Sequence, residues 1–299
     1  MRKTTRFRQL LARPGHVVVP FAFDAFSAQL VEAAGFEAVG ITGSGLAQSL
    51  LGFPDVGWVT MTEVVNQARN IANAVNIPVY TDADTGYGNA LNVMRTVHES
   101  EAAGLAGLFF EDQDAPKKCG HFEGKRVISR EEMILKIKAA LEARRDLDFV
   151  VIARTDARAV HGLAEAIERG RAYAEAGADA IFVEAPQSVE ELREIAASIK
   201  APLMVNMVEG GKTPLLGVEE LAAMGYRLIT FSNSVSRTAG WAIQQVLREI
   251  KEKGTTAAFT DRMISFKERN RILGLDRVYE LERRFLPADG SDSSEAEKG

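Results

Sequence analysis

One short pattern recurs four times along this chain of 299 residues, and it constrains the fold more than any other feature. Each copy contains small residues, ends in glycine, closes a helix-like stretch and precedes a β-branched stretch. The copies end at Gly35, Gly104, Gly177 and Gly225. Glycine favours a left-handed helix C-cap, and the alanines before it let a helix pack closely on a sheet. The repeat therefore predicts helices that alternate with the strands of one sheet.

The complete pattern contains eight strand-like segments with amphipathic helical segments between them. We predict strands at 16–23, 38–43, 78–84, 107–111, 149–155, 180–184, 203–208 and 227–232. Eight such units in a chain of this length favour a (β/α)8 TIM barrel, and the alternative is a doubly wound open sheet. Three of the helices begin with a capping-box pattern, at Thr60, Ser129 and Ser188.

The C-terminal part of the chain is expected to be helical. A long helix is predicted over 235–253, and a second, charge-rich helical stretch over 261–285. We expect residues 1–287 to form a single barrel domain with this helical appendage, which packs on another barrel or subunit. Residues 288–299 are rich in Ser, Asp, Glu and Gly, a composition typical of a disordered tail.

Composition narrows the classes of function. The formal net charge is −5 and the basic residues form no stripe, so nucleic acid is not an expected partner. A single cysteine excludes an intramolecular disulfide and indicates a reducing compartment. The sequence shows neither a secretory signal nor an apolar run of roughly 18 residues. We therefore expect a cytoplasmic protein that does not associate with membranes.

Acidic residues gather where the predicted strands end, which is where such barrels carry their active sites. Asp82 and Asp84 are two apart on one strand, so both are expected to face the barrel mouth. Two like charges there need a cation or a proton, and oxygen-only ligands suit Mg²⁺ or Mn²⁺. Glu111 is expected to hold a metal-bound water, and Glu184 adds to the acidic set. The alternative is a solvated acidic turn.

Arg154 ends an otherwise apolar strand, where its guanidinium must meet a carboxylate. It either pairs with Glu184 or Asp156, or binds a substrate carboxylate through two hydrogen bonds. Backbone N–H groups and hydroxyls for anionic oxygens are offered by Thr42, Gly43 and Ser44.

The only cysteine lies in a loop bounded by glycine, Lys-Lys-Cys-Gly-His-Phe-Glu-Gly at 117–124. Lys117, Lys118 and His121 surround Cys119, and cationic neighbours lower the pKa of a thiol and make it a competent proton donor and acceptor. We expect this loop to close over the barrel mouth as a lid. The alternatives are an inert buried cysteine and a histidine with no role beyond the loop.

Taken together, these motifs resemble the isocitrate lyase/phosphoenolpyruvate mutase superfamily over about residues 7–285. The matching stretches are Pro20–Ala28, Thr42–Gly45, Gly52–Asp55, Asp82–Gly88, Glu111–Gln113, Lys117–His121, Ala153–Ala157 and Gly210–Pro214. The Lys-Lys-Cys-Gly-His loop is typical of the carbon–carbon lyase branch, which includes methylisocitrate and alkylmalate lyases.

The resemblance implies a homotetramer, a dimer of dimers in which the eighth helix of each barrel is swapped between subunits. It implies Mg²⁺ on Asp82 and Asp84, with Glu111 and Asp55 reaching it through water. Cys119 would protonate the carbanion left by bond cleavage. The implied catalytic group is Cys119, Lys117, His121 and Glu111. The implied substrate contacts are Thr42, Gly43, Ser44, Gly120, Arg154, Glu184, Asn206 and Arg237.

Several positions depart from the pattern of methylisocitrate lyases. Gly40 replaces a tyrosine, which leaves the base for the hydroxyl proton unassigned. Val208 replaces a threonine and Phe266 an arginine, whereas Arg237 matches an arginine that those lyases use for an extra carboxylate. Val208 and the Gly210–Pro214 run are more similar to carboxyvinyl-carboxyphosphonate phosphorylmutase, which shares the cysteine loop.

The expected function is therefore Mg²⁺-dependent cleavage of the C2–C3 bond of a 2-hydroxy di- or tricarboxylate, of the methylisocitrate or 2-alkylmalate type. The products would be pyruvate or glyoxylate and a succinate-like acid. One alternative is a phosphorylmutase that forms a P–C bond, and another is an oxaloacetate hydrolase or decarboxylase. A non-catalytic dicarboxylate sensor is a fourth, and the complete set of metal and proton-transfer residues argues against it.

Overall fold

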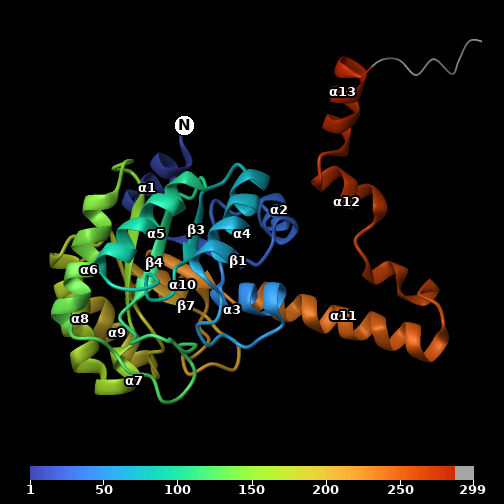
Figure 1. Ribbon diagram of the computed structural model, residues 1–299. Coiled ribbons are helices and arrows are strands. Elements are labelled where there is room, and N and C mark those ends of the chain that lie inside the picture. The colour runs from blue at the N-terminus through green and yellow to red at the C-terminus, as the bar shows by residue number, and fades with distance from the viewer. Residues whose placement is uncertain (287–299) are drawn as a thin grey trace, which may run out of the picture. The chain divides into compact units, whose positions relative to one another are not determined.

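In a computed structural model that describes residues 1–286, eight parallel strands close into a barrel surrounded by helices (Figure 1). The strands are β1 (Val17–Ala22), β2 (Val39–Ile41), β3 (Val79–Asp82), β4 (Gly107–Glu111), β5 (Val150–Thr155), β6 (Ala180–Val183), β7 (Leu203–Asn206) and β8 (Leu228–Phe231). Each strand pairs with the next, and β1 pairs with β8, where Val17 lies opposite Leu228. The predicted TIM barrel is confirmed, and the open sheet is wrong.

Helices follow the strands as the repeat predicts. They are α2 (Ala25–Ala33), α3 (Gly43–Leu46), the π-helix η1 (Ala47–Leu51), α4 (Met61–Ala74), α5 (Ala90–Ala102), α6 (Arg130–Ala143), α7 (Ala157–His161), α8 (Leu163–Glu175), α9 (Val189–Ser198) and α10 (Val218–Met224), with α1 (Lys3–Ala12) before the first strand. The four repeat glycines have φ between +84° and +105°, so each makes the expected left-handed turn.

Only one of the three predicted capping boxes is complete. Thr60 and Glu63 exchange both hydrogen bonds at the start of α4. At Ser188 the hydroxyl accepts the N–H of Glu191, but the Glu191 carboxylate instead accepts from Arg158 Nε at 2.9 Å. Ser129 likewise caps α6 in one direction only. These helices still begin at the predicted places, because the hydroxyl alone satisfies one free backbone donor.

Apolar side chains also fill the inside of the barrel. Phe21, Tyr80, Phe109 and Phe182 are nearly wholly buried and form one cluster, in which neighbouring rings lie 5.5–6.3 Å apart. Helix α1 adds Phe7, whose ring stacks on Tyr80 at 5.0 Å. Because α1 contributes to this cluster from outside the sheet, it covers one end of the barrel. The other end carries the polar residues that follow the strands.

The C-terminal residues form α11 (Ser234–Lys253), the 3₁₀ helix η2 (Ala257–Arg262), α12 (Phe266–Ile272) and α13 (Leu275–Phe285). The predicted helical stretch is thus interrupted, in part by Gly274 at φ +75°. The chain divides into two compact units, one over Met1–Ala242 and one that starts at Ile243. A single domain over 1–287 stays a prediction, and the predicted tail at 288–299 lies outside the described residues. Within residues 1–286, no helix is both long and apolar enough to span a membrane.

Candidate active site

The barrel positions the candidate site through the alternation of its strands. Side chains two residues apart on a strand face the same side. Glu111 therefore follows the interior residue Phe109, and Glu184 follows Phe182, so each carboxylate emerges directly above the aromatic core. Each of the five site residues at the strand ends lies two positions after an interior residue of the strand. These are Asp82, Glu111, Arg154, Glu184 and Asn206.

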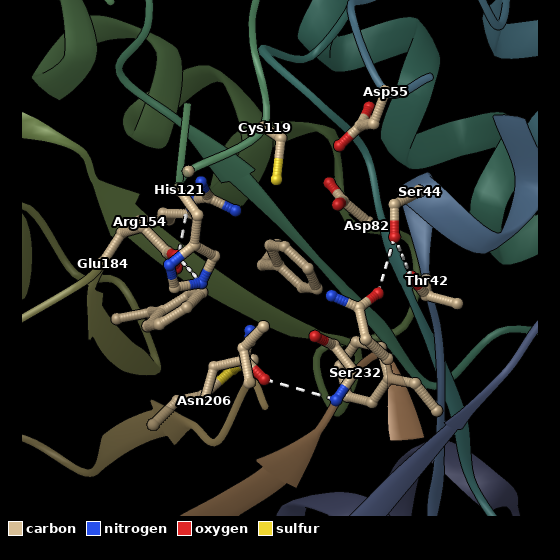
Figure 2. Close-up of a pocket in the computed structure, with 17 residues that line it drawn as sticks. Thr42, Ser44, Asp55, Asp82, Cys119, His121, Arg154, Glu184, Asn206 and Ser232 are labelled. Atoms are coloured by element: carbon tan, nitrogen blue, oxygen red, sulfur yellow. Dashed lines mark hydrogen bonds and ion pairs between the residues drawn. The ribbon is translucent and has the colours of Figure 1, made fainter. Parts of the chain in front are cut away.

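These strand ends surround a cavity of about 40 Å³ (Figure 2). Ten of the residues expected from the sequence line it, namely Thr42, Ser44, Asp55, Asp82, Cys119, Gly120, His121, Arg154, Glu184 and Asn206. In Figure 2 the Cys119 thiol points into the cavity between His121 and Arg154 on one side and Asp55 and Asp82 on the other. The structure thus brings the predicted loop and the predicted strand ends to one place.

The two aspartates of the predicted metal site are arranged differently from the expectation. β3 ends at Asp82, and Asp84 lies beyond it with φ +48°, so the argument that both face one side of a strand is wrong. The turn instead brings the Asp84 N–H to Asp82 Oδ1 at 2.9 Å. Burial raises the pKa of Asp82 to about 7 and also raises that of Asp84, although Lys117 opposes both shifts.

Lys117 is buried among these carboxylates. Its Nζ lies 2.6 Å from Asp55 Oδ1 and 3.0 Å from Asp84 Oδ1. Although burial disfavours the ammonium, the surrounding carboxylates raise the pKa of Lys117 well above its ordinary value. A positive charge is therefore held between two of the groups expected at the metal.

Glu111 is the most deeply buried acid of the group. Its Oε1 accepts from Gln113 Nε2 at 3.1 Å, whereas Oε2 has no hydrogen-bond partner among residues 1–286. Burial raises the pKa of Glu111 well above its usual range, and Arg154 opposes this. A buried carboxylate oxygen without a hydrogen bond is costly unless a cation lies near it, and here Arg154 Nη1 lies 3.7 Å away.

The donor set fits a hard divalent cation that keeps several waters. All the candidate ligands are carboxylate oxygens, which Mg²⁺ and Mn²⁺ prefer. Within the described part of the chain, no three His, Cys, Asp or Glu side chains converge closely enough to hold a metal directly. A site with Asp82 and Asp84 as direct ligands, and other carboxylates acting through water, agrees with the oxygen-only ligands and with the lack of a third direct ligand.

Arg154 makes the structural pairing that the sequence left open. Its Nε donates to Asp156 Oδ2 at 2.8 Å and its Nη2 to Asp156 Oδ1 at 3.1 Å. Nε also lies 3.8 Å from Glu184 Oε2, and Nη1 lies 3.7 Å from Glu111 Oε2. Because Arg154 still lines the cavity, pairing with Asp156 orients the guanidinium without removing it from the site.

The predicted effect of the cations on Cys119 is wrong. Burial raises the pKa of the Cys119 thiol, and the N–H of His121 and the charge of Lys117 offset this only in part. The reason is that the thiol is buried and that the nearby carboxylates of Asp55 and Glu184 also raise its pKa. The thiol therefore keeps its proton at neutral pH, which suits a proton donor.

His121 has one hydrogen-bond partner and lies close to one carboxylate. Its Nδ1 accepts the N–H of Lys212 at 3.1 Å, and its Nε2 lies 3.3 Å from Glu184 Oε1. Burial lowers the pKa of His121, so the ring is neutral at pH 7. Because Nδ1 accepts, the proton of the neutral ring lies on Nε2.

Two polar residues that hold the loop escaped the sequence analysis. The Gln113 amide accepts the N–H of Lys118 at 3.0 Å and donates to the Lys118 carbonyl at 2.8 Å. Lys125 donates to the Gly120 carbonyl and, at 3.0 Å, to Asp156 Oδ1. Gln113 lies in the matching stretch Glu111–Gln113, but neither residue was given a role, because each becomes buried only when the loop folds back on the barrel.

The floor of the cavity is apolar, which the sequence analysis also missed. It consists of Phe21, Phe109, Phe182 and Met204, and Val208, which the sequence had singled out, also lines the cavity. The alternation of Val17, Val19 and Phe21 along the first strand is the signal that identifies Phe21 as inward-facing. A Cβ at Gly40 would lie 2.3 Å from Phe21 Cε1, so this ring occupies the space that a larger residue at position 40 needs.

The remaining predicted residues lie around the cavity or apart from it. An added Cβ at Gly43 would lie 2.8 Å from Asp82 Oδ2, so glycine lets the backbone approach this carboxylate. Ser44 Oγ donates to Asn233 Oδ1 at 2.8 Å. Arg237 instead lines a separate pocket with Glu209, whose carbonyl accepts from its guanidinium.

Comparison with known proteins gives consistent matches over nearly the whole chain. Residues 7–251 match the family model described as phosphoenolpyruvate phosphomutase. The chain is 47% identical to the 2,3-dimethylmalate lyase of Eubacterium barkeri, over 95% of this chain and 99% of that protein. It is also 47% identical to the chloroplastic carboxyvinyl-carboxyphosphonate phosphorylmutase of Arabidopsis thaliana, over 94% of this chain and 84% of that protein. Its identity to the 2-methylisocitrate lyase of Aeropyrum pernix is 45%, over 89% of this chain and 86% of that protein.

Solved structures agree with this similarity. Oxaloacetate acetylhydrolase in complex with the inhibitor 3,3-difluorooxalacetate superimposes with a TM-score of 0.90 at 36% identity, over 94% of this chain and 96% of that one. Phosphonopyruvate hydrolase in complex with oxalate and Mg²⁺ superimposes with a TM-score of 0.87 at 34% identity, over 96% and 100%.

Proposed function

Because this chain belongs to the phosphoenolpyruvate phosphomutase family, we propose that it is a Mg²⁺-dependent carbon–carbon lyase. Its substrate would be a 2-hydroxy di- or tricarboxylate of the 2-alkylmalate or methylisocitrate type. The C2–C3 bond would break to give pyruvate or glyoxylate and a second acid. That acid is a monocarboxylate when the substrate is a 2-alkylmalate, and a succinate-like dicarboxylate when it is a tricarboxylate of the methylisocitrate type. The substrate class is supported by the relatives that are named 2,3-dimethylmalate lyase and 2-methylisocitrate lyase.

The observation that carries this proposal is the position of the Cys119 thiol. It points into the same cavity as Asp82, and burial keeps its proton in place at neutral pH. Cleavage of the C2–C3 bond leaves its electron pair on C3, and the hydroxyl proton on C2 is lost to a base. Cys119 would then transfer the Sγ proton to C3, which completes the second product.

Other side chains would bind and orient the substrate. Arg154 would meet a carboxylate with a guanidinium that Asp156 holds in place. The hydroxyls of Thr42 and Ser44 would contact further oxygens from the opposite wall. The cysteine loop, residues 115–125, would exclude water from the carbanion, which water would otherwise protonate without control.

Asp82 and Asp84 would hold Mg²⁺, with Glu111 and Asp55 acting through water. When bound, the cation would supply positive charge that stabilises the negative charge developing on the substrate oxygens. The assignment is supported by the oxygen-only donor set, by Glu111 Oε2, which has no hydrogen-bond partner among residues 1–286, and by the Mg²⁺ named for phosphonopyruvate hydrolase. Calorimetric titration with Mg²⁺ tests it, because Asp82→Asn should weaken binding at least ten-fold.

A second candidate function is phosphoryl transfer. The sequence identity to carboxyvinyl-carboxyphosphonate phosphorylmutase is 47%, as it is to dimethylmalate lyase, and Val208 lines the cavity where the methylisocitrate lyases carry threonine. Oxaloacetate hydrolysis is a third candidate, because oxaloacetate acetylhydrolase shares the fold at 36% identity.

One substrate panel separates these functions. The protein is incubated with Mg²⁺ and 2,3-dimethylmalate, other 2-alkylmalates, methylisocitrate, isocitrate, oxaloacetate or phosphonopyruvate. Release of 2-oxo acids is followed by a coupled assay, and phosphorus chemistry by ³¹P NMR. A 2-oxo acid from a malate or methylisocitrate supports the lyase. Its absence from all of them, with turnover of a phosphonate or of oxaloacetate, contradicts the lyase.

We also propose that the protein is a homotetramer built from helix-swapped dimers. Large apolar side chains on α11 are exposed in the single chain, as Trp241 (61%), Leu247 (57%) and Ile250 (45%) show. Exposed apolar groups of this size usually mark a contact surface. Analytical ultracentrifugation tests the proposal, and a monomer at micromolar concentration contradicts it. A cytoplasmic location stays a prediction.

A further inference from the structure

The turn after β7 touches the cysteine loop at two points, although about 90 residues separate them. We call residues 209–213, Glu-Gly-Gly-Lys-Thr, the β7 turn. The backbone N–H of Lys212 donates to His121 Nδ1 at 3.1 Å, and Lys212 Nζ lies 2.5 Å from Glu123 Oε1. These contacts join the loop that carries Cys119 to the β7 turn, which has no other role in the proposed reaction.

Gly211 makes the close approach possible. A Cβ on Gly211 would lie 2.8 Å from His121 Cε1 and 2.9 Å from His121 Nδ1, nearer than side-chain carbons pack. Gly211 does not have a positive φ, so its backbone conformation alone does not require glycine. Gly210 has φ +73° and forms the turn itself. The two glycines therefore serve different purposes, the first in turning the chain and the second in making room for the histidine ring.

We propose that the β7 turn is a latch that holds the cysteine loop closed, with Gly211 and Lys212 as positioning residues for His121. The latch fixes the position of the His121 ring, whose Nε2 lies 3.3 Å from Glu184 Oε1 without forming a hydrogen bond. It thereby holds Cys119, two residues earlier in the same loop, over the cavity. The catalytic consequence rests on the proposed function, whereas the latch itself does not.

The two contacts of the latch are unequal. The Glu123 side chain is 88% exposed, so its ion pair with Lys212 is screened by solvent and adds little. The His121 side chain is only 14% exposed, and its hydrogen bond comes from the backbone of Lys212 rather than from its ammonium. The fit of Gly211 against the imidazole should therefore matter more than the charge of Lys212.

The single cysteine offers a direct test, because no other thiol reacts. The rate at which a thiol reagent modifies Cys119 is measured without substrate, and the rate in urea serves as the reference for the unfolded chain. We expect Gly211→Ala to speed modification about ten-fold or more, because the added methyl group displaces His121. Gly217→Ala is the matched control, since no atom lies within 4 Å of its added Cβ and its φ is −70°. Lys212→Met keeps the backbone N–H and should stay within about two-fold of wild type.

Equal rates for wild type, Gly211→Ala and Gly217→Ala would overturn the latch, and so would a wild-type rate equal to that in urea. If Gly211→Ala does not fold, ¹⁵N NMR of the wild-type protein tests the latch instead, because it shows which ring nitrogen of His121 carries the proton. The His121 signal is assigned by its loss in His121→Gln. A His121 ring protonated on Nε2 alone supports the latch, and one protonated on Nδ1 contradicts it. Neither readout requires substrate, so a failed latch and a failed lyase assignment are distinguishable.

Discussion

The side-chain amide of Gln113 donates to the buried carboxylate of Glu111, with 3.1 Å between Nε2 and Oε1. The same amide holds both the N–H and the carbonyl of Lys118. One side chain thus connects a carboxylate of the proposed metal site with the loop that carries the thiol. Asparagine at this position would be too short to make both sets of contacts.

We expect Gln113→Glu to lower the free energy of unfolding by about 1–3 kcal/mol. The change removes the donor to Glu111 and places a second acid beside it in a buried position. Urea unfolding followed by circular dichroism measures the effect. Gln187→Glu is a suitable control, because Gln187 is exposed and the same change of charge there should shift stability by less than about 0.5 kcal/mol. Equal effects of the two changes would argue against the role of Gln113.

Cys119→Ser should reduce turnover by about 10² to 10⁴-fold, because a serine hydroxyl is a much weaker acid than a thiol. Mg²⁺ affinity and the melting temperature should not change, since the thiol holds neither the metal site nor the core. Burial raises the pKa of Cys119, so the donor stays protonated above the ordinary thiol range and activity should fall only at higher pH. Steady-state kinetics against pH measures both effects, and an unimpaired variant would refute the role of the thiol.

Because its pKa is lowered in the fold, Asp156 should make the protein less stable in acid. Burial alone would raise the pKa of Asp156, but Arg154 and Lys125 lower it to about 2. Because this pKa is below the unfolded value of about 3.9, the ionised carboxylate stabilises the fold at pH values above about 4. The stabilisation, about 2 kcal/mol, is lost as the pH falls from 4 towards 2.

Asp156→Asn should therefore be less stable than wild type at pH 7, and the difference should shrink between pH 4 and pH 2. Removing one partner from such a buried pair typically costs about 3–5 kcal/mol. Urea unfolding at several pH values measures the difference. A difference between the two proteins that does not change with pH would show that Asp156 does not carry this charge in the fold.

Gly40 and Phe21 should behave as a coupled pair. Gly40→Ala places a methyl group 2.3 Å from the Phe21 ring, so we expect a loss of about 1–3 kcal/mol from overpacking. Phe21→Ala alone should cost about 3–5 kcal/mol, because it leaves a cavity in the barrel core. In the double variant the space vacated by the ring accepts the methyl group. The double-mutant cycle should therefore show a favourable coupling, and strict additivity would contradict the contact.

Much of the fold follows from local signals along the chain. The four glycine repeats, the eight β-branched segments and the cap at Thr60 each report a short-range preference, and each marks an element at the predicted place. The residues Asp82, Glu111, Arg154 and Glu184 were identified for the same reason, since the end of a parallel strand is a position that sequence can locate.

The properties of those residues depend on distant parts of the chain. Asp84 reaches Asp82 through a left-handed turn rather than along a strand. The ammonium of Lys117 is paired with Asp55 and Asp84, and although it lowers the pKa of the Cys119 thiol, burial outweighs this effect. Phe21 fills the space beside Gly40 only because β1 and β2 are neighbours in the barrel.

The sequence by itself therefore determined the barrel, the end of it that carries the site, and the identity of the chemical groups found there. Tertiary structure alone decided how those groups are paired and protonated. The physical reason is that strand and turn preferences act over a few residues, whereas burial and charge pairing depend on which segments meet in space. The pKa of Cys119 shows the difference, because its neighbours in sequence favour a thiolate and its neighbours in space favour a thiol.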